Sequence, residues 1–461
     1  MRHLLNALLA IACLAGACTS AGDAPGAFPA SSAEPPNVVI IVTDDQRLET
    51  LETMPKTLRW MQRGGTRYTN AYVTTPLCCP SRSSIMTGRY AHNHGVRINP
   101  AGSRLDESTT LQHHLQRAGY RTGMFGKFLS GRPLTEDPRY FDSWGVMDHH
   151  SRYSGARWNL DGDLRRVDAY ATRFIGQLAR NFIERAEAQN DAAPWFLYLA
   201  PPAPHAPRIP EPRYADLPVP PWSGNPAIRE RDRSDKPPYV REAVETTPAR
   251  AVRSAQIRTL ASVDDLVGNL FSTLETHREE RQTLVFYLSD NGYLWSEHGM
   301  PTNFMAKSNP YTQSIQVPML VRWPGHLPHG EIDDRLVANI DIVPTILDAA
   351  NIADEELRAL DGKSLLSDSK RTRLLTEYWT SNESPIPDWA SIVTRSYQYT
   401  EYYDPQDRPV FREYYDLFVD PWQLNNLLAD VGRSDSPPSA EVRKLHEMLI
   451  RDRSCRGSSC P

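Results

Sequence analysis

Three stretches of the chain are nearly continuous runs of apolar residues. These stretches are residues 37–45, 195–199 and 283–290. A run without polar alternation is typical of a strand that is buried on both faces, as in a parallel sheet. Between these runs, residues 110–118 and 255–276 have apolar positions at helical spacing. The alternation predicts an α/β fold with a large mixed, mostly parallel sheet flanked by helices.

The pattern changes beyond about residue 350. Residues 388–394, 397–403 and 413–418 are short runs in which polar and apolar side chains alternate. Such runs are typical of half-buried strands, so they predict a smaller C-terminal domain built on an antiparallel sheet. We expect residues 339–347 to form the helix that leads into it.

These patterns divide the chain into five predicted parts. Residues 206–250 fall inside the largest part and are rich in proline and charge, with little periodicity. A connection of that length in a folded domain is usually functional, and we interpret it as a wall of a substrate cleft. The five parts are a signal peptide at 1–18, a flexible linker at 19–36, a main domain at 37–350, a C-terminal α+β subdomain at 351–450 and a tail at 451–461.

The N-terminus has the pattern of an export signal. A basic start is followed by a short apolar stretch, which is too short to span a bilayer. The sequence Leu-Ala-Gly-Ala-Cys ends at Cys18 and resembles a bacterial lipobox, in which that cysteine would be lipidated. The alternative is an ordinary signal-peptidase cut near Ala17 or Ala21. We therefore expect a secreted or cell-surface bacterial lipoprotein that meets the membrane only through a lipid anchor.

The net charge limits the classes of partner that the protein can bind, and the cysteines indicate its redox environment. The 461 residues carry a formal net charge of −5, which does not favour binding to nucleic acid. Removal of the signal leaves Cys78, Cys79, Cys455 and Cys460, plus Cys18 if it is retained. Cys455 and Cys460 enclose a short loop, and in an exported protein we expect them to form a disulfide.

Polar residues follow two of the predicted buried strands. Asp44 and Asp45 end the first strand, and Asp290 and Asn291 end another. Ligands of open α/β sheets bind at the carboxyl ends of strands. Three carboxylates and an amide oxygen suit a hard divalent cation, and Ca²⁺ accepts irregular geometry more readily than Mg²⁺. The alternative for each acidic pair alone is a helix cap or a turn.

Residues 78–88 read Cys-Cys-Pro-Ser-Arg-Ser-Ser-Ile-Met-Thr-Gly. Taken alone, they could be two adjacent cysteines in a turn made by Pro80. The string nevertheless resembles the type I sulfatase signature C-x-P-S-R-x-x-x-x-T-G. In that family a formylglycine-generating enzyme oxidises the first cysteine to formylglycine. The resemblance implies that Cys78 is the precursor of the nucleophile, that Arg82 lies beside it, and that residues 37–350 form a sulfatase catalytic domain.

Further motifs extend the resemblance over residues 36–430. Residues 119–127 are similar to the second sulfatase signature, whose closing lysine, here Lys127, binds the sulfate. Pro204-His205-Ala-Pro resembles the family's P-H-x-P, which makes His205 the expected general acid. Lys307 occupies the position of a second sulfate-binding lysine, and His298 lies in a further family-like pattern whose role is less defined. The resemblance places the chain in the alkaline phosphatase-like superfamily.

The same resemblance implies a mechanism. Ca²⁺ would be held by Asp44, Asp45, Asp290 and Asn291, and it would neutralise sulfate charge together with Arg82, Lys127 and Lys307. The hydrated aldehyde at position 78 would supply one hydroxyl for in-line attack on sulfur. Its second hydroxyl would then lose a proton, expel sulfate and regenerate the aldehyde.

Within the family the chain looks most similar to the N-acetylglucosamine-6-sulfatases. The doubled cysteine and residues 87–96 carry this likeness. The chain departs from them at Leu129, where many sulfatases have histidine, and at Asn99-Pro100, where an Asn-Asn pair is usual. His149 or His150 would fill the place of the missing histidine. We expect a sulfated carbohydrate as substrate, such as 6-O-sulfated N-acetylglucosamine in a glycosaminoglycan.

Two alternatives stay open at this point. One is an aryl sulfatase, or a phosphonate or phosphate ester hydrolase of the same superfamily. The other is a non-catalytic, surface-anchored glycan-binding lipoprotein in which Cys78 stays unmodified.

Overall fold

The three apolar runs form neighbouring parallel strands at the centre of one ten-stranded sheet. They are β1 (Asn37–Thr43), β7 (Trp195–Ala200) and β8 (Thr283–Ser289), and β1 pairs with both of the others. The computed structural model describes residues 34–148, 152–189, 192–245, 248–352, 359–368, 370–381, 384–429 and 439–461.

The sheet is mixed and its centre is parallel, which confirms the predicted fold class. Its strand order is β10-β2-β9-β8-β1-β7-β3-β4-β5-β6, and the run from β8 to β4 is parallel throughout. Antiparallel pairing is limited to β9 with its two neighbours and to the pairs β4–β5 and β5–β6. The remaining strands are β2 (Thr66–Tyr72), β3 (Arg121–Gly126), β4 (Ser143–Met147), β5 (Ala156–Leu160), β6 (Asp163–Val167), β9 (Met319–Arg322) and β10 (Glu331–Ala338).

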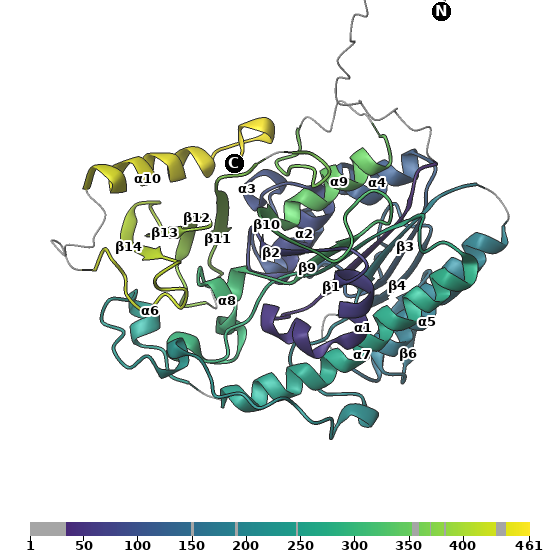
Figure 1. Ribbon diagram of the computed structural model, residues 1–461, viewed down its shortest axis with the longest axis horizontal. Helices are drawn as coiled ribbons and strands as arrows, with labels where there is room; N and C mark the ends of the chain where they lie inside the picture. The colour runs from purple at the N-terminus through teal and green to yellow at the C-terminus, as the bar shows by residue number, and fades with distance from the viewer. Residues whose placement is uncertain are drawn as a thin grey trace, which may run out of the picture. The chain divides into compact units, whose positions relative to one another are not determined.

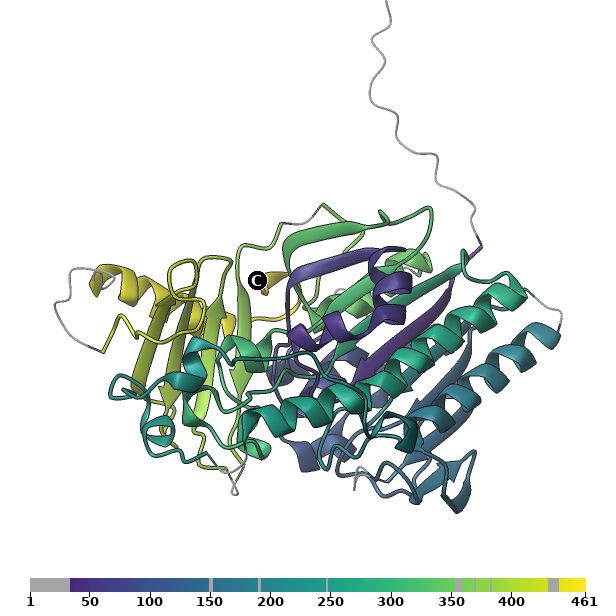
Figure 2. The same cartoon turned by 60° about the horizontal axis from the view of Figure 1, so that its bottom comes forward.

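Helices cover both faces of this sheet (Figure 1). Val38, Ile40 and Val42 of β1 contribute to one apolar core, whereas Val39 and Ile41 contribute to a second core on the opposite face. The first core includes residues of α2 (Cys78–Thr87), α4 (Leu111–Arg117) and α9 (Ile342–Ala349). The second is covered by α5 (Ala171–Ala188) and α7 (Ala249–His277), which run side by side in Figure 2. Burial on both faces explains why the strand sequences lack polar alternation.

A separate four-stranded antiparallel sheet follows in the C-terminal part, as predicted. Its order is β11-β12-β13-β14, with strands at Leu374–Tyr378, Asp388–Val393, Tyr397–Tyr403 and Pro409–Asp416. The last strand begins four residues earlier than the run at 413–418 indicates, because Pro409–Glu413 pair with β13. Further short helices are α1 (Pro55–Thr57), α3 (Ala91–His94), α6 (Pro238–Arg241) and α8 (Thr312–Ile315), and α10 (Ser439–Asp452) follows the sheet.

The predicted helices are present with small shifts of their ends. The helix predicted at 110–118 is α4, and the one predicted at 255–276 begins six residues earlier as α7. The stretch at 339–347 forms a 3-10 turn, Asn339–Asp341, that continues into α9. The division of the chain at residue 350 stays a prediction.

The predicted signal peptide, Cys18 and most of the linker lie outside the described residues. No helix in the described ranges is long and apolar enough to cross a membrane. At the other end of the chain, Cys455 and Cys460 form a disulfide. The Cys455 carbonyl accepts hydrogen bonds from the side chains of His92 and Asn93, so the disulfide loop packs against α3.

The end of β3 requires a glycine. Gly126 has φ +120°, and a Cβ atom added there would lie 2.1 Å from the Ala200 carbonyl oxygen on the neighbouring strand. The next residue, Lys127, donates its backbone N–H to that same carbonyl at 2.8 Å. The close approach therefore fixes the point at which Lys127 leaves the sheet.

We expect Gly126→Ala to lower the free energy of unfolding by roughly 3 kcal/mol or more, because it adds a backbone clash to an unfavourable φ. The matched control is Gly119→Ala, where φ is +88° and no atom lies within 4 Å of the added Cβ. That variant should lose only about 1–2 kcal/mol. Thermal unfolding of both variants checks this, and equal melting temperatures would contradict the role given to the clash.

Candidate functional site

The polar residues that follow β1 and β8 meet at one edge of the large sheet. The Asp45 N–H donates to Asp290 Oδ1 at 3.2 Å, and Asn291 Nδ2 donates to Asp45 Oδ1 at 2.7 Å. Asp45 has φ +67°, which turns the chain sharply after the strand. Asp44, Asp45, Asp290 and Asn291 are all buried. The predicted meeting of these four side chains is therefore present in the structure.

Helix α2 brings Cys78 and Arg82 to the same edge. The helix begins at Cys78, and Cys78 Sγ lies 3.4 Å from Asp44 Oδ1. Arg82 lies one helical turn later and is fully buried. Its Nε donates to Asp290 Oδ2 at 2.8 Å, and its NH1 group donates to the Lys127 carbonyl at 2.9 Å. One helix thus supplies both residues of the cysteine signature.

Two lysines complete the cluster, each paired with one of the two aspartates that follow β1. Lys127, directly after β3, forms an ion pair with Asp44. Lys307 follows a 3-10 turn at Phe304–Ala306, and its Nζ lies 2.7 Å from Asp45 Oδ1 and 3.1 Å from Cys78 Sγ. Both lysines are about 95% buried. Buried ammonium groups require carboxylate partners, and these carboxylates provide them.

His205 approaches from the turn that follows β7. Its Nε2 lies 3.8 Å from Asp45 Oδ2, and its Nδ1 contacts the Ala206 carbonyl oxygen at 2.7 Å. Nδ1 therefore carries a hydrogen and Nε2 faces the cluster. Burial lowers the pKa of His205, although the neighbouring Asp44 carboxylate opposes that shift.

The charges of the cluster shift one another's pKa values. Burial alone would raise the pKa of Asp44, but the surrounding cations, Lys127 foremost, hold it below its usual range. The pKa of Asp290 rises to about 6, because burial and the nearby Asp44 carboxylate outweigh the cations. Burial raises the pKa of the Cys78 thiol to about 12, so this thiol is protonated at neutral pH. As a free cysteine, Cys78 would be a poor nucleophile.

The donor set fits a hard divalent cation. Asn291 Oδ1 is buried and has no hydrogen-bond partner among the described residues, while its Nδ2 group is occupied by Asp45 and by the Gly292 carbonyl. One ligand atom from each of Asp44, Asp45, Cys78 and His205 lies within 4.8 Å of the others. Three carboxylates and an amide oxygen with a free lone pair match the ligands that Ca²⁺ takes in proteins.

The remaining predicted residues lie elsewhere or outside the described ranges. His298 is fully buried, its Nδ1 lies 2.7 Å from Glu230 Oε2, and its ring lies against Tyr311. These contacts are structural, and its substrate role stays a prediction. His149 and His150 lie outside the described residues, as does Cys18. Leu129, where many sulfatases have histidine, packs into an apolar core of the sheet.

Several residues that hold the cluster in place are not marked by any motif in the sequence. Asn99 Oδ1 accepts the Cys79 N–H at 2.9 Å, and Asn339 Nδ2 donates to Ser81 Oγ at 3.0 Å, so both fix the first turn of α2. Gln256 of α7 donates to the Asp45 carbonyl at 3.4 Å. These contacts join positions that are far apart in the chain, and no spacing in the sequence marks them.

Arg208 is a further cation near the cluster that the sequence analysis did not select. Its guanidinium lies 5.0 Å from the ring centroid of Tyr293 and donates to the Tyr293 hydroxyl. Tyr293 follows Asn291 by two residues and is buried. Arg208 belongs to the proline-rich segment 206–250, which was predicted to line a cleft. This segment therefore places a positive charge beside Tyr293.

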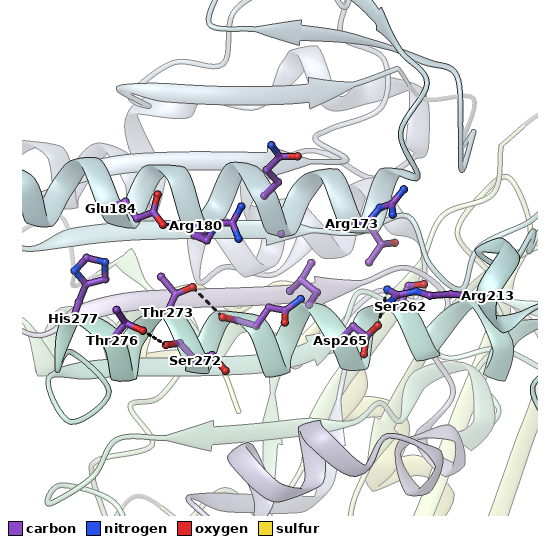
Figure 3. A pocket seen from close by; sticks show the side chains of 15 residues that line it. Arg173, Arg180, Glu184, Arg213, Ser262, Asp265, Ser272, Thr273, Thr276 and His277 are labelled. Carbon is purple, nitrogen blue, oxygen red and sulfur yellow. Dashed lines mark hydrogen bonds and ion pairs between the residues drawn. The ribbon is translucent and has the colours of Figure 1, made fainter.

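A polar groove of about 470 Å³ between α5 and α7 is separate from this cluster (Figure 3). Figure 3 shows Arg173 and Arg180 on one helix opposite Thr273 and His277 on the other. None of the residues of the cluster lines the groove. The cluster has nine members: Asp44, Asp45, Cys78, Arg82, Lys127, His205, Asp290, Asn291 and Lys307. Its arginines pair with nearby carboxylates, such as Arg213 with Asp265 at 2.6 Å. The residues of the cluster therefore lie at the edge of the large sheet and not in this groove.

The chain matches two known family models. The model described as Sulfatase covers residues 36–352, and the model described as N-sulphoglucosamine sulphohydrolase, C-terminal, covers residues 297–451. The first spans all nine residues of the cluster.

Similar curated proteins carry sulfatase names. The N-acetylglucosamine-6-sulfatase of Homo sapiens is 31% identical over 489 residues, which cover 92% of this chain and 86% of the relative. The extracellular sulfatase SULF-1 homologue of Drosophila melanogaster is 32% identical over 350 residues, covering 72% of this chain. The chain spans 31% of that relative and 48% of the Caenorhabditis elegans Sulf-1 homologue, so these two are much longer proteins.

Solved structures share the fold. A protein solved in complex with its substrate D-glucosamine-2-N,6-O-disulfate has a TM-score of 0.75 at 22% identity, covering 91% of this chain and 98% of that one. The phosphonate monoester hydrolase of Agrobacterium radiobacter has a TM-score of 0.69 at 20% identity, with coverage of 91% and 95%. The solved structures share the fold, and the family match with the N-acetylglucosamine-6-sulfatase relatives confirms the resemblance drawn from the sequence motifs: the chain belongs to the sulfatase family, in the alkaline phosphatase-like superfamily.

Proposed function

We propose that this protein is a sulfatase that hydrolyses sulfate monoesters on a sulfated carbohydrate. One observation carries the proposal: Cys78 Sγ lies 3.1 Å from Lys307 Nζ and 3.4 Å from Asp44 Oδ1, inside a buried cluster of cations and carboxylates. Here Sγ stands in for the oxygen atoms that formylglycine would carry. Conversion requires a formylglycine-generating enzyme, which would act before folding because Cys78 is only 2% exposed.

The substrate proposal rests on the relatives. Three N-acetylglucosamine-6-sulfatases, from goat, human and cattle, are each 31% identical, and the chain covers at least 82% of each. We infer 6-O-sulfated N-acetylglucosamine, within a glycosaminoglycan, as the first candidate substrate. Two relatives are named extracellular sulfatases, which supports the proposal of an exported enzyme. Lipidation at Cys18 is part of the same proposal.

The cations of the cluster would bind and neutralise the sulfate. Lys307 contacts Cys78, and Lys127 pairs with Asp44, which also contacts Cys78. Arg82 is held by Asp290 and by the Lys127 carbonyl. Fixed positive groups favour the transition state because they need no reorganisation as charge shifts toward the leaving oxygen. As its hydrate, formylglycine would supply one hydroxyl for attack on sulfur and a second whose deprotonation releases sulfate.

Asp44, Asp45, Asp290 and Asn291 would hold Ca²⁺. When bound, the ion would supply a Lewis acid for the sulfate oxygens. His205 would protonate the departing sugar oxygen from Nε2, because its Nδ1 is engaged with the Ala206 carbonyl.

A phosphonate or phosphate ester hydrolase remains the nearest rival, since one such enzyme shares the fold. Three carboxylates and three cations balance one another in the cluster, so its formal charge does not distinguish a sulfate ester from a phosphonate or phosphate ester. The family match favours sulfate.

The protein made together with a formylglycine-generating enzyme should release sulfate from N-acetylglucosamine 6-sulfate, and faster than it cleaves an aryl phosphonate. Its tryptic peptide 68–82 should lack the Cys78 sulfur while Cys79 is still alkylated. Cys78→Ala should lose at least about 1,000-fold in kcat/KM, because it removes the covalent step. Cys79→Ala is the matched control. Glycan binding without turnover by a converted protein would overturn the proposal.

Calcium should stabilise the folded protein, because a ligand that binds only the folded state adds about 2.7 kcal/mol at a hundredfold excess over its Kd. We expect a rise in melting temperature with Ca²⁺ that EDTA reverses and that Asn291→Ala abolishes. Asn269→Ala is the control, because Asn269 is an exposed residue of α7 that lines the α5–α7 groove away from the cluster. An equal calcium shift in the wild type and in Asn291→Ala would rule out the assigned ligands.

His205→Ala should slow substrates according to their leaving groups. An alkoxide leaves poorly without a proton, whereas 4-nitrophenolate leaves well. We expect a loss of about 100-fold or more in kcat/KM for the sugar sulfate and a much smaller loss for 4-nitrophenyl sulfate. The control is His329→Ala, an exposed histidine. Equal losses on both substrates would mean that His205 acts in some way other than proton donation.

A further inference from the structure

A second hollow lies where the proline-rich segment meets the start of α7. Its volume is about 570 Å³, and Trp222 lines it together with Arg250 and Arg253. The rest of its wall consists of prolines, serines and a valine, and no carboxylate lines it. This composition differs from that of the α5–α7 groove, whose arginines are already paired.

Neither arginine of the hollow forms a close ion pair with a described residue. The Glu49 carboxylate, which pairs with Arg47, acts on Arg253 only from a longer distance. Arg250 is exposed. Arg253 lies with its guanidinium 5.5 Å from the ring centroid of Trp222 and donates to the Pro220 carbonyl at 2.8 Å. A guanidinium fixed beside an indole ring offers a charge and an apolar face side by side. Such a pair can bind an anionic group together with the C–H face of a sugar ring.

The hollow is connected to the reaction site through packed side chains. Trp222 packs edge to face against Trp295 with ring centroids 5.2 Å apart. Trp295 Nε1 donates to Gln256 Oε1 at 2.6 Å, and Gln256 in turn donates to the Asp45 carbonyl. Three side chains therefore link the wall of the hollow to the backbone of a proposed calcium ligand.

We propose that this hollow is a second binding subsite for a sulfated or carboxylated sugar unit of the chain whose sulfate ester lies in the reaction site. The proposal rests on the proposed function, and it assigns Arg250 and Arg253 to an anionic group and Trp222 to the sugar ring. Arginine suits this role because its planar fork matches sulfate and carboxylate oxygens. The subsite gives extended substrates an affinity that a monosaccharide does not gain.

The test compares two substrates across matched variants. With a heparin-derived tetrasaccharide, Arg250→Ala should lower kcat/KM about tenfold, mainly through KM, as expected for one lost charge-assisted contact. With N-acetylglucosamine 6-sulfate as a monosaccharide, the Arg250→Ala variant should match the wild type. Arg180→Ala, an exposed arginine of the α5–α7 groove, is the control and should change neither value.

Equal losses on both substrates, or no loss on either, would overturn the subsite. Binding separates this failure from failure of the proposed function. The tetrasaccharide should bind the Cys78→Ala variant, and adding Arg250→Ala should weaken that binding about tenfold whether or not the wild type turns the substrate over. Unchanged binding would also overturn the subsite, and a wild type that binds without turnover would overturn only the proposed function.

Discussion

Mutual neutralisation of buried charge is the constraint on which the rest of this site depends. Three carboxylates, on Asp44, Asp45 and Asp290, share a buried volume with the cations of Arg82, Lys127 and Lys307. Moving one such ion out of water costs several kcal/mol even after relaxation, and an unpaired one is not tolerated. Each of these side chains is therefore stable only because the others are present. These six charged residues come from five separate segments of the chain, and the fold must bring all five segments together to keep the charges paired.

That constraint also explains why an ordinary cysteine is a poor reagent here. The Cys78 thiol lies beside Asp44, and burial and this carboxylate both raise its pKa, to about 12, although two lysines are near. A thiolate would add a fourth negative charge to a cluster that is already balanced. Conversion to an uncharged aldehyde hydrate removes this difficulty, because its oxygens need not be ionised to occupy the site. The balanced charge of the cluster is thus consistent with the proposed conversion of Cys78 to formylglycine.

The sequence was informative where residues act through local pattern. The apolar runs predicted β1, β7 and β8, and their polar ends predicted that Asp45, Asp290 and Asn291 would meet. Lys307 and His205 could be selected only by resemblance, because nothing local marks a lysine in a turn or a histidine among prolines. The start of α2 at Cys78 and the contact of Asn339 with Ser81 were missed, since both depend on the packing of distant segments. The start of β14 was predicted four residues too late for the same reason, because it is set by pairing with β13.

The second sheet takes part in positioning the cluster. Trp389 of β12 donates its indole N–H to the Ser308 carbonyl at 2.8 Å, and the Ser308 N–H donates to the Pro76 carbonyl at 2.9 Å. These bonds hold the residue after Lys307 against the segment that enters α2. Residues of the buried cluster are therefore fixed from two sheets and have little freedom to vary, whereas Leu129 and Arg208 lie outside its network of ion pairs. We therefore expect the residues that determine substrate specificity in such enzymes to lie in the walls around the cluster, because a substitution there leaves the buried balance of charge intact.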